Sequence, residues 1–213
     1  MALYANTPLV IALSKGRPLK QLLERLARLE IRPIEDMLVS RKLVFDTQHS
    51  NIKLMVLRGL DVATYVDHGI ADLGMVGKDV LLEFEGDGFY EPLDLKIAQC
   101  EIMEAGMIDE PALPRRLRVA TKFVQTAKKY YAQKGVQIDM IKLTGAMELA
   151  PVMGLAHRII DIVETGSTLR ANGLEPKAQV CSISSRLIVN KVAFKTKQIA
   201  IEAVIEALGS EAE

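Results

Sequence analysis

Aromatic side chains are scarce in this chain of 213 residues: phenylalanine, tyrosine and tryptophan together make up 5%, and tryptophan is absent. Hydrophobic residues nevertheless account for 49% of the sequence. The core must therefore be built mainly from leucine, isoleucine, valine, alanine and methionine, a composition that suits an α/β protein. The length allows one large domain or two small ones.

A net charge is also lacking, because 27 lysines and arginines balance 27 aspartates and glutamates. The sequence therefore gives no reason to expect nucleic-acid or membrane binding through a long-range electrostatic field. Any anionic ligand must be held by local groups.

Cysteines are few, and no leader sequence is visible. Cys100 and Cys181 lie far apart among apolar or small residues, which indicates buried thiols in a reducing cytoplasm rather than a disulfide framework. Residues 1–16 contain no basic leader, and their apolar run breaks at Ser14-Lys15-Gly16. We therefore expect a first strand there, and neither a signal peptide nor a membrane span.

Short apolar runs alternate with helical patterns along the chain. Runs bounded by glycine, aspartate or asparagine predict strands at residues 9–13, 52–57, 72–76, 117–120, 138–143 and 159–163. Helical patterns lie at residues 18–29, 61–68, 78–83, 122–134, 147–155 and 197–208. This alternation implies parallel sheets joined by right-handed crossovers.

Two long β-prone stretches, residues 93–103 and 178–192, bracket the middle of the chain as two hinge-crossing strands would. We therefore expect two lobes, with residues 1–95 and 180–213 in lobe I and residues 96–179 in lobe II. Residues 104–118 read as an irregular connection because they contain two prolines. Ligands of such folds usually lie in the cleft between lobes, at the carboxyl ends of strands.

The segment Glu164-Thr165-Gly166-Ser167-Thr168 follows the strand predicted at residues 159–163 and opens a short helix that Asn172-Gly173 should close. Its backbone N–H groups and three hydroxyls can surround a phosphate, and its glycine lets the backbone approach closely. Asp161 and the first residue of the segment can accept hydrogen bonds from sugar hydroxyls. The alternative is an ordinary capping turn with surface acids.

The stretch Leu13-Ser14-Lys15-Gly16-Arg17-Pro18 also joins a strand end, a glycine turn and a helix start, and it carries two cations. Further basic stretches lie at expected strand boundaries: Ser40-Arg41-Lys42, Arg58-Gly59 and Lys78-Asp79. Each is a candidate anion site or a solvated basic turn. Four loop cations from one lobe, set against two loop acids from the other, would suit a magnesium-bound polyphosphate sugar.

The sequence contains no motif for a metal site or for nucleophilic catalysis. The three histidines have no ligand spacing, and no Gly-x-Ser-x-Gly elbow or nucleophile–base pair occurs. Covalent catalysis is therefore not indicated.

Five motifs together carry a resemblance over nearly the whole chain: IALSKGRP, SRKLVF, ADLGMVGKDVL, IKLTGAMELAP and DIVETGSTLRANGL. They resemble the short form of the ATP phosphoribosyltransferase family. The resemblance implies an α/β protein with a two-lobed, periplasmic-binding-protein-like (type II) fold and a mixed, mainly parallel sheet in each lobe. It also implies the first reaction of histidine biosynthesis, which joins N1 of ATP to C1 of 5-phosphoribosyl 1-pyrophosphate and releases pyrophosphate.

The resemblance also assigns roles to residues. It implies that Arg17 and Arg41 help pyrophosphate to leave. The residues implied for phosphoribosyl pyrophosphate are Asp161, Glu164, Thr165, Gly166, Ser167 and Thr168. Those implied for ATP or pyrophosphate are Leu13, Ser14, Lys15, Gly16, Arg58 and Lys78. The expected cofactor is Mg²⁺, carried mainly by the substrates, and its protein ligands are left unassigned.

The same resemblance implies a homodimer within a hetero-oligomer, with a histidyl-tRNA-synthetase-like regulatory subunit as partner, in the cytoplasm. Two rival functions stay open on the residues alone. A two-lobed solute receptor or effector domain shares the expected fold but should carry a leader or a helix-turn-helix. A nucleotide-salvage phosphoribosyltransferase should have adjacent acids before its loop, whereas Asp161 and Glu164 are separated.

Overall fold

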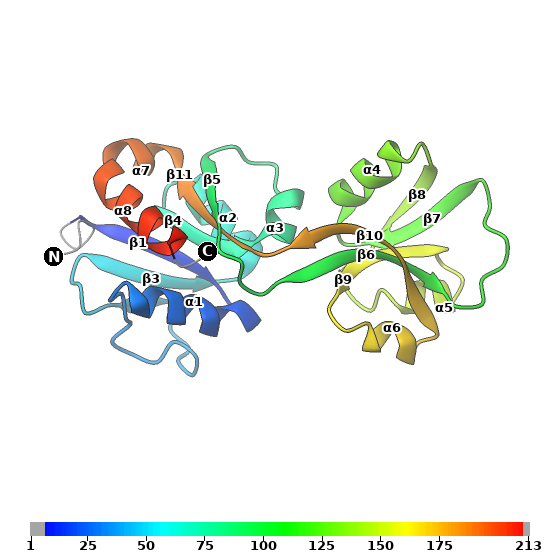
Figure 1. Ribbon diagram of the computed structural model, residues 1–213, viewed down its shortest axis with the longest axis horizontal. Coiled ribbons are helices and arrows are strands. Elements are labelled where there is room, and N and C mark those ends of the chain that lie inside the picture. Colours follow the sequence, from blue (N-terminus) through cyan, green and yellow to red (C-terminus); the bar gives the residue numbers. More distant parts are fainter. Residues whose placement is uncertain (1–6, 211–213) are drawn as a thin grey trace. The chain divides into compact units, whose positions relative to one another are not determined.

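The computed structural model describes residues 7–210 of the chain (Figure 1). They fall into two compact units, divided between Gln99 and Cys100 and between Ile183 and Ser184. The expected lobe boundaries lay at residues 95/96 and 179/180, so each observed division comes four residues later.

Unit 1 is a six-stranded sheet with helices on both faces. The strand order is β2-β3-β1-β4-β11-β5. The strands are β1 (Leu9–Ser14), β2 (Val44–Asp46), β3 (Ile52–Leu57), β4 (Leu73–Gly77), β5 (Phe89–Asp94) and β11 (Ser185–Asn190). The helices are α1 (Arg17–Arg28), α2 (Gly59–Asp67), α3 (Lys78–Glu83), α7 (Lys191–Thr196) and α8 (Gln198–Gly209).

Parallel pairing in unit 1 is confined to three neighbouring strands. β1 runs parallel to β3 and β4, whereas β2 and β11 pair with their neighbours in the antiparallel sense. The carboxyl ends of β3, β1 and β4 therefore lie side by side at one edge of the sheet. In open α/β sheets this is the edge at which ligands bind.

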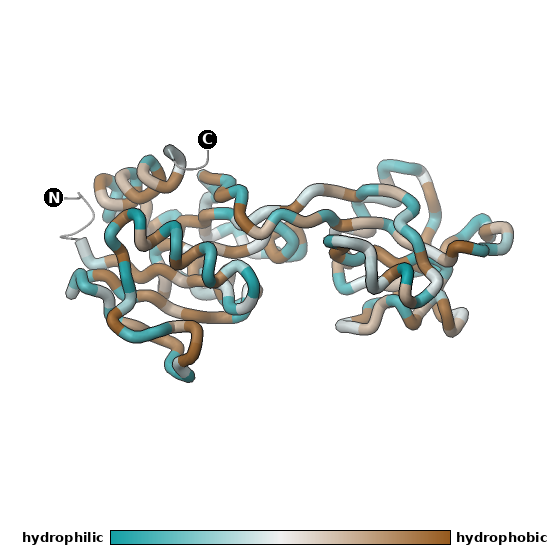
Figure 2. Tube along the Cα trace, turned by 60° about the horizontal axis from the view of Figure 1, so that its bottom comes forward, coloured by the Kyte–Doolittle hydropathy of each residue, from teal (hydrophilic) through white to brown (hydrophobic). Residues whose placement is uncertain are grey.

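Two hydrophobic layers hold the sheet of unit 1. Odd-numbered residues of β1 pack with the leucine face of α1 and with α8, while Ala12 and neighbouring strand residues pack against α2 on the other face. A Cβ at Gly74 on β4 would lie 2.7 Å from Val66 of α2, so that helix packs directly on the strand backbone. Figure 2 shows the strands mostly in brown, with hydrophilic and hydrophobic positions alternating along the helices.

Unit 2 contains a five-stranded sheet of order β10-β6-β9-β7-β8. Its strands are β6 (Cys100–Met107), β7 (Arg116–Thr121), β8 (Gln137–Lys142), β9 (Arg158–Val163) and β10 (Leu174–Ile183), and its helices are α4 (Val124–Gln133), α5 (Leu149–Val152) and α6 (Ser167–Ala171). β7 is parallel to β8 and β9, while β6 is antiparallel to β9 and β10. Both sheets are thus mixed, as expected. Neither is mainly parallel, because among the described residues unit 1 has two parallel and three antiparallel strand pairings and unit 2 has two of each, so this part of the expectation was wrong.

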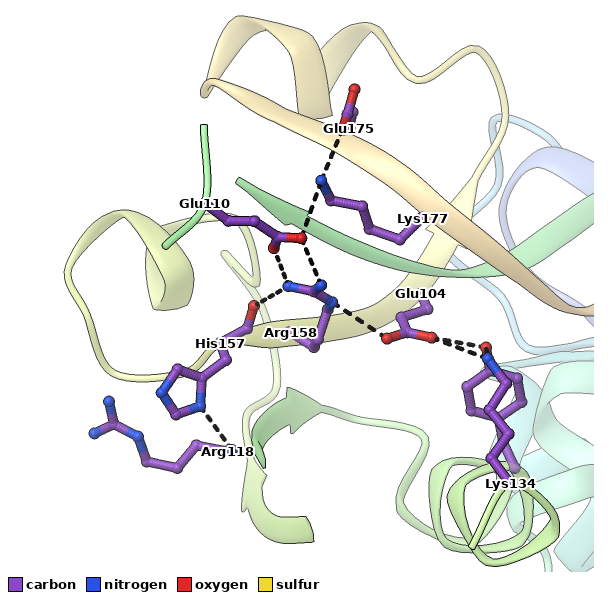
Figure 3. Close-up of polar contacts among 9 residues, drawn as sticks. Glu104, Glu110, Arg118, Lys134, His157, Arg158, Glu175 and Lys177 are labelled. Atoms are coloured by element: carbon purple, nitrogen blue, oxygen red, sulfur yellow. Dashed lines mark hydrogen bonds and ion pairs between the residues drawn. The ribbon is translucent and has the colours of Figure 1, made fainter. Parts of the chain in front are cut away.

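The two faces of the sheet in unit 2 differ in polarity. Apolar residues of α5 and α6 pack with Ala105 and Ile159 on one face. On the other face, Tyr130 of α4 donates a hydrogen bond of 2.7 Å to the buried carboxylate of Glu104. Figure 3 shows that Glu104 and Glu110 flank the guanidinium of Arg158. This face therefore holds a buried network of charges.

The six strands predicted from apolar runs are all confirmed, within a residue or two of their ends. Several other predictions need correction. The stretch at residues 93–103 is not one strand. β5 ends at Asp94, and the backbone then turns at Lys96 and Ala98, which both adopt positive φ, before β6 begins. The irregular connection is shorter than residues 104–118, since β6 continues to Met107. The helix predicted at residues 147–155 is a single turn.

Candidate active site

Three of the predicted cations follow the three parallel strands of unit 1. Lys15 comes directly after β1, Arg58 after β3 and Lys78 after β4. The backbone N–H of Lys15 donates to the carbonyl of Leu57, at 2.7 Å, and joins two of these strand ends. The register therefore brings to one edge the residues that the sequence separates by more than sixty positions.

The turn after β1 is held from within the sheet. Leu13 is fully buried, and the buried hydroxyl of Ser14 donates to the carbonyl of Met75, at 3.0 Å. Gly16 has a φ of 105°, a left-handed conformation that favours glycine, and it precedes α1. Arg17 is the first residue of that helix and is exposed.

A pocket of about 350 Å³ lies beside this turn. It is lined by Lys15, Gly16, Leu19, Met37, Leu38, Ser40, Arg41, Lys42, Leu43 and Val56. The structure thus unites two stretches that the sequence presented separately, the turn after β1 and the Ser40–Lys42 loop before β2. The lining combines aliphatic side chains with three cations, although the ammonium of Lys42 is also paired with Glu35.

Three predicted cations of unit 1, Arg17, Arg58 and Lys78, lie outside that lining. Arg58 is exposed at the start of α2. The ammonium of Lys78 is 2.5 Å from a carboxylate oxygen of Glu91, and the Lys78 side chain is only 28% exposed. Lys78 therefore already has a carboxylate partner that the sequence did not reveal.

The predicted phosphate segment of unit 2 is a tight loop between β9 and α6. Gly166 adopts left-handed dihedrals (φ 68°, ψ 9°), and the exposed hydroxyls of Thr165 and Ser167 lie 3.0 Å apart. The guanidinium of Arg170 donates to the carbonyl of Thr165, at 2.9 Å. Gly173 ends the helix with a φ of 72°, which confirms the predicted left-handed cap.

Asp161 lies near this loop, two residues before the end of β9. One of its carboxylate oxygens accepts from the N–H of Ile162, at 2.8 Å, and the same oxygen lies 3.5 Å from the ammonium of Lys122. Lys122 directly follows β7 and was not singled out by sequence reasoning. The sequence could have indicated Lys122, because it is a cation that follows a predicted strand, as Arg58 and Lys78 are.

A second polar region of unit 2 lies at the opposite end of β7 and β9. A pocket of about 210 Å³ is lined there chiefly by prolines and aliphatic residues, together with Glu110, Arg118 and His157. Burial, and then the nearby charges of Arg118 and Arg158, lower the pKa of His157. The hydrogen bond from Arg158 is the main cause of the lowered pKa of Glu110.

The described residues contain neither a cluster of metal ligands nor a helix that could cross a membrane. In residues 7–210, no group of three or more histidine, cysteine, aspartate or glutamate side chains could hold a metal ion. None of the helices in this same range is long and apolar enough to cross a membrane. Cys100 and Cys181 lie on the neighbouring strands β6 and β10 and are only partly buried, so the prediction that both are buried was wrong.

This chain is similar in sequence to known proteins of one family. The family model described as HisG: ATP phosphoribosyltransferase matches residues 58–210. The ATP phosphoribosyltransferase of Marinomonas sp. (strain MWYL1) is 57% identical over 200 residues, which cover 94% of each chain. That of Pseudomonas aeruginosa is 56% identical over 200 residues, covering 94% of this chain and 95% of the relative. The chain belongs to the ATP phosphoribosyltransferase family.

The family model begins at Arg58, so it leaves out the pocket residues 15–43, whereas the relatives align over most of the chain. A solved structure titled ATP phosphoribosyl transferase (HisG:HisZ) complex, from Thermotoga maritima, is 32% identical with a TM-score of 0.81 and covers 96% of this chain and 98% of its own. The periplasmic aliphatic sulphonate binding protein SsuA of Escherichia coli matches at 16% identity with a TM-score of 0.62, covering 97% and 72%. That likeness shows the fold alone, and the fold is the two-lobed one expected.

Proposed function

We propose that this chain is an ATP phosphoribosyltransferase that converts ATP and 5-phosphoribosyl 1-pyrophosphate into N1-(5-phosphoribosyl)-ATP and pyrophosphate, the first step of histidine biosynthesis. The observation that carries the proposal is the 57% identity to a relative of that name over 94% of the chain. The geometry adds two candidate sites, one in each unit, whose chemistry suits the two substrates.

The site in unit 1 suits a nucleotide or pyrophosphate. In the pocket of about 350 Å³, aliphatic side chains offer an apolar surface to a purine, while Lys15 and Arg41 offer positive charge to phosphates. Arg17 and Arg58 add charge from the turn after β1 and from the end of β3. Lys78 contributes only if its ammonium exchanges Glu91 for a phosphate.

The site in unit 2 suits the phosphorylated sugar. We assign the 5-phosphate to the backbone N–H groups and hydroxyls of residues 165–168, because a left-handed glycine followed by a helix start directs successive N–H groups to one side. Asp161 and Glu164 then accept hydrogen bonds from the ribose hydroxyls.

The reaction needs little proton chemistry. N1 of adenine carries a free lone pair near neutral pH, so no general base is required to expose it. The lone pair forms the bond to C1 of the ribose, and the bond from C1 to the pyrophosphate oxygen breaks with its electron pair. Negative charge therefore grows on pyrophosphate, and fixed cations such as Arg17 and Arg41 stabilise it.

Magnesium fits this scheme as a companion of the substrates. The described residues offer no cluster of three ligands, whereas polyphosphates bind Mg²⁺ and deliver it with them. When bound, the ion neutralises part of the phosphate charge.

We further propose that the chain works in the cytoplasm as a homodimer within a hetero-oligomer. Its partner is a histidyl-tRNA-synthetase-like regulatory subunit. The similarity at 32% identity to the chain from the Thermotoga maritima complex titled HisG:HisZ supports a partner subunit. The cytoplasm, the homodimer and the synthetase-like character of the partner rest on the family resemblance.

The test is product formation followed by the separation of chemistry from binding. Mass spectrometry should detect phosphoribosyl-ATP when the purified protein, assembled with its regulatory subunit, receives ATP, Mg²⁺ and phosphoribosyl pyrophosphate. No product above a protein-free control would exclude the activity. Arg17→Ala and Arg41→Ala should each slow the single-turnover rate by about 10² or more, since one lost preorganised donor costs about 3 kcal/mol of transition-state stabilisation.

Arg32→Ala is the matched control, because Arg32 is an exposed arginine of unit 1 that does not line the pocket. Its single-turnover rate should equal that of the wild type. If the Arg17 and Arg41 variants also keep the wild-type rate, these two residues have no catalytic role.

A further inference from the structure

Lys122 stands on the same side of the sheet as the proposed sugar site. Thr121 pairs in register with Ile160, so the next residues, Lys122 and Asp161, are neighbours across the parallel strands β7 and β9. Asp161 alternates with Ile159 and Val163 on the face of the sheet that α6 covers, and the ammonium of Lys122 lies 3.5 Å from the Asp161 carboxylate. The loop of residues 164–168 leaves β9 at this edge and begins α6.

The local backbone fixes the base of Lys122. The buried hydroxyl of Thr121 donates to the carbonyl of Ile160, at 2.6 Å, and accepts from the N–H of Phe123, at 2.9 Å. The Lys122 ammonium lies 4.8 Å from the centre of the Phe123 ring, and Phe123 is itself buried. These contacts hold Lys122 between a rigid strand end and the start of α4.

The ion pair between Lys122 and Asp161 does little for stability. The two atoms are 3.5 Å apart, and the side chains are 43% and 24% exposed, so water screens the attraction. The pair therefore needs another explanation. The charge of the ligand provides this explanation. A sugar phosphate brings several negative charges to an edge that already holds Asp161 and Glu164, and a lysine there offsets part of that charge.

We propose that Lys122 is a substrate-positioning residue of the phosphoribosyl site. Its ammonium holds the Asp161 carboxylate toward the ribose hydroxyls and offsets the charge of that carboxylate when the anionic sugar binds. This inference rests on the proposed function, and it assigns to β7 a part of the site that otherwise comes from β9 and α6.

The experiment measures the dissociation constant of magnesium phosphoribosyl pyrophosphate by titration calorimetry on the full chain. Lys122→Met should raise the dissociation constant about tenfold, the loss expected for one charge-assisted hydrogen bond. Lys122→Arg should restore most of the affinity. In steady-state kinetics the KM for the sugar should rise, while kcat should change less than about threefold, because the lost interaction contributes to binding and not to the chemical step.

Lys129→Met is the matched control, because Lys129 is an exposed lysine on α4 of the same unit. Its dissociation constant and the melting temperatures of all variants should equal those of the wild type. A structural role would instead lower the melting temperature of Lys122→Met and leave its affinity unchanged.

A double-mutant cycle with Asp161→Asn tests the route of the effect. If Lys122 acts through Asp161, Lys122→Met should cost little further affinity in that background. If the two substitutions instead raise the dissociation constant independently, so that their separate factors multiply in the double variant, the positioning role is wrong. Wild-type affinity in Lys122→Met would overturn the inference alone, whereas a wild-type chain that binds no phosphoribosyl pyrophosphate would overturn the proposed function as well.

Discussion

Arg158→Met is the most informative test of how unit 2 holds together. The Arg158 side chain is 6% exposed and lies between two carboxylates (Figure 3). Its Nη2 donates to Glu110, at 2.8 Å, and its Nη1 donates to Glu110 and to the carbonyl of His157. Its Nε is 3.2 Å from Glu104, in an ion pair without the alignment of a hydrogen bond. Methionine keeps much of the volume and removes the charge.

The expected loss in the free energy of unfolding is about 3 kcal/mol, the low end of the range for breaking one side of a buried ion pair. The low end applies because both carboxylates keep other partners. Glu104 retains the hydroxyl of Tyr130 and, at 3.5 Å, the ammonium of Lys134. Glu110 is 24% exposed and retains Lys177 at 3.4 Å.

The control is Arg116→Met in the same unit. Arg116 lies 2.6 Å from Asp139, but the two side chains are 63% and 52% exposed. Such an exposed pair contributes about 0–1 kcal/mol. Comparing the two variants therefore contrasts a buried arginine between two carboxylates with an exposed arginine paired with Asp139.

The assay is urea unfolding followed by hydrogen exchange and mass spectrometry, because the chain has no tryptophan and its units need separate probes. Peptides from β9 and α4 should lose protection at lower urea in Arg158→Met, while peptides from β1 should not change. Equal midpoints for the Arg158 and Arg116 variants would refute the reasoning.

The same comparison depends on pH in a defined direction. Arg158 lowers the pKa of Glu110 in the folded protein, so its contribution is present above the unfolded pKa and is lost as pH falls through the folded pKa. The difference between wild type and Arg158→Met should therefore shrink below about pH 4.3, the ordinary pKa of glutamate. An equal difference at pH 7 and at about pH 3 would assign the loss to packing instead of charge.

Two glycine substitutions test the fit of the backbone. Gly74→Ala should cost about 1–3 kcal/mol in unfolding experiments, because its Cβ would lie 2.7 Å from Val66, whereas Gly145→Ala, with open space around it, should cost little. Gly166→Ala should cost about 1–2 kcal/mol for its left-handed backbone and should raise the dissociation constant of phosphoribosyl pyrophosphate in calorimetry. Unchanged affinity in that variant would remove Gly166 from the proposed site.

Much of the fold was readable from the sequence because its elements are amphipathic or uniformly apolar. The leucine spacing of α1 predicted that helix to within one residue of each end, and Pro18 fits its first turn. The elements missed were short or exposed. β2 has three residues, two of them exposed, and β5 contains Pro92 and is partly exposed, so neither gives an apolar run.

The sequence predicted the separate stretches of the candidate site but not how they come together. Most of the basic or hydroxyl-rich stretches followed a predicted strand, and such positions favour ligand binding in parallel sheets. The exception is Ser40-Arg41-Lys42, which precedes β2 and follows no predicted strand. The pocket between the turn after β1 and the Ser40–Lys42 loop was not predictable, because residues 30–43 contain no strand or helix whose periodicity could place them.

The amino-acid sequence by itself determined which segments become strands and helices and which loops carry clustered basic or hydroxyl side chains, because side-chain periodicity and turn residues act over a few positions. The tertiary structure alone decided that Arg41 shares a pocket with Lys15, that Lys122 meets Asp161, and that Arg158 is buried between Glu104 and Glu110. These contacts depend on strand order and register, which join residues far apart in the chain and leave no local pattern in the sequence.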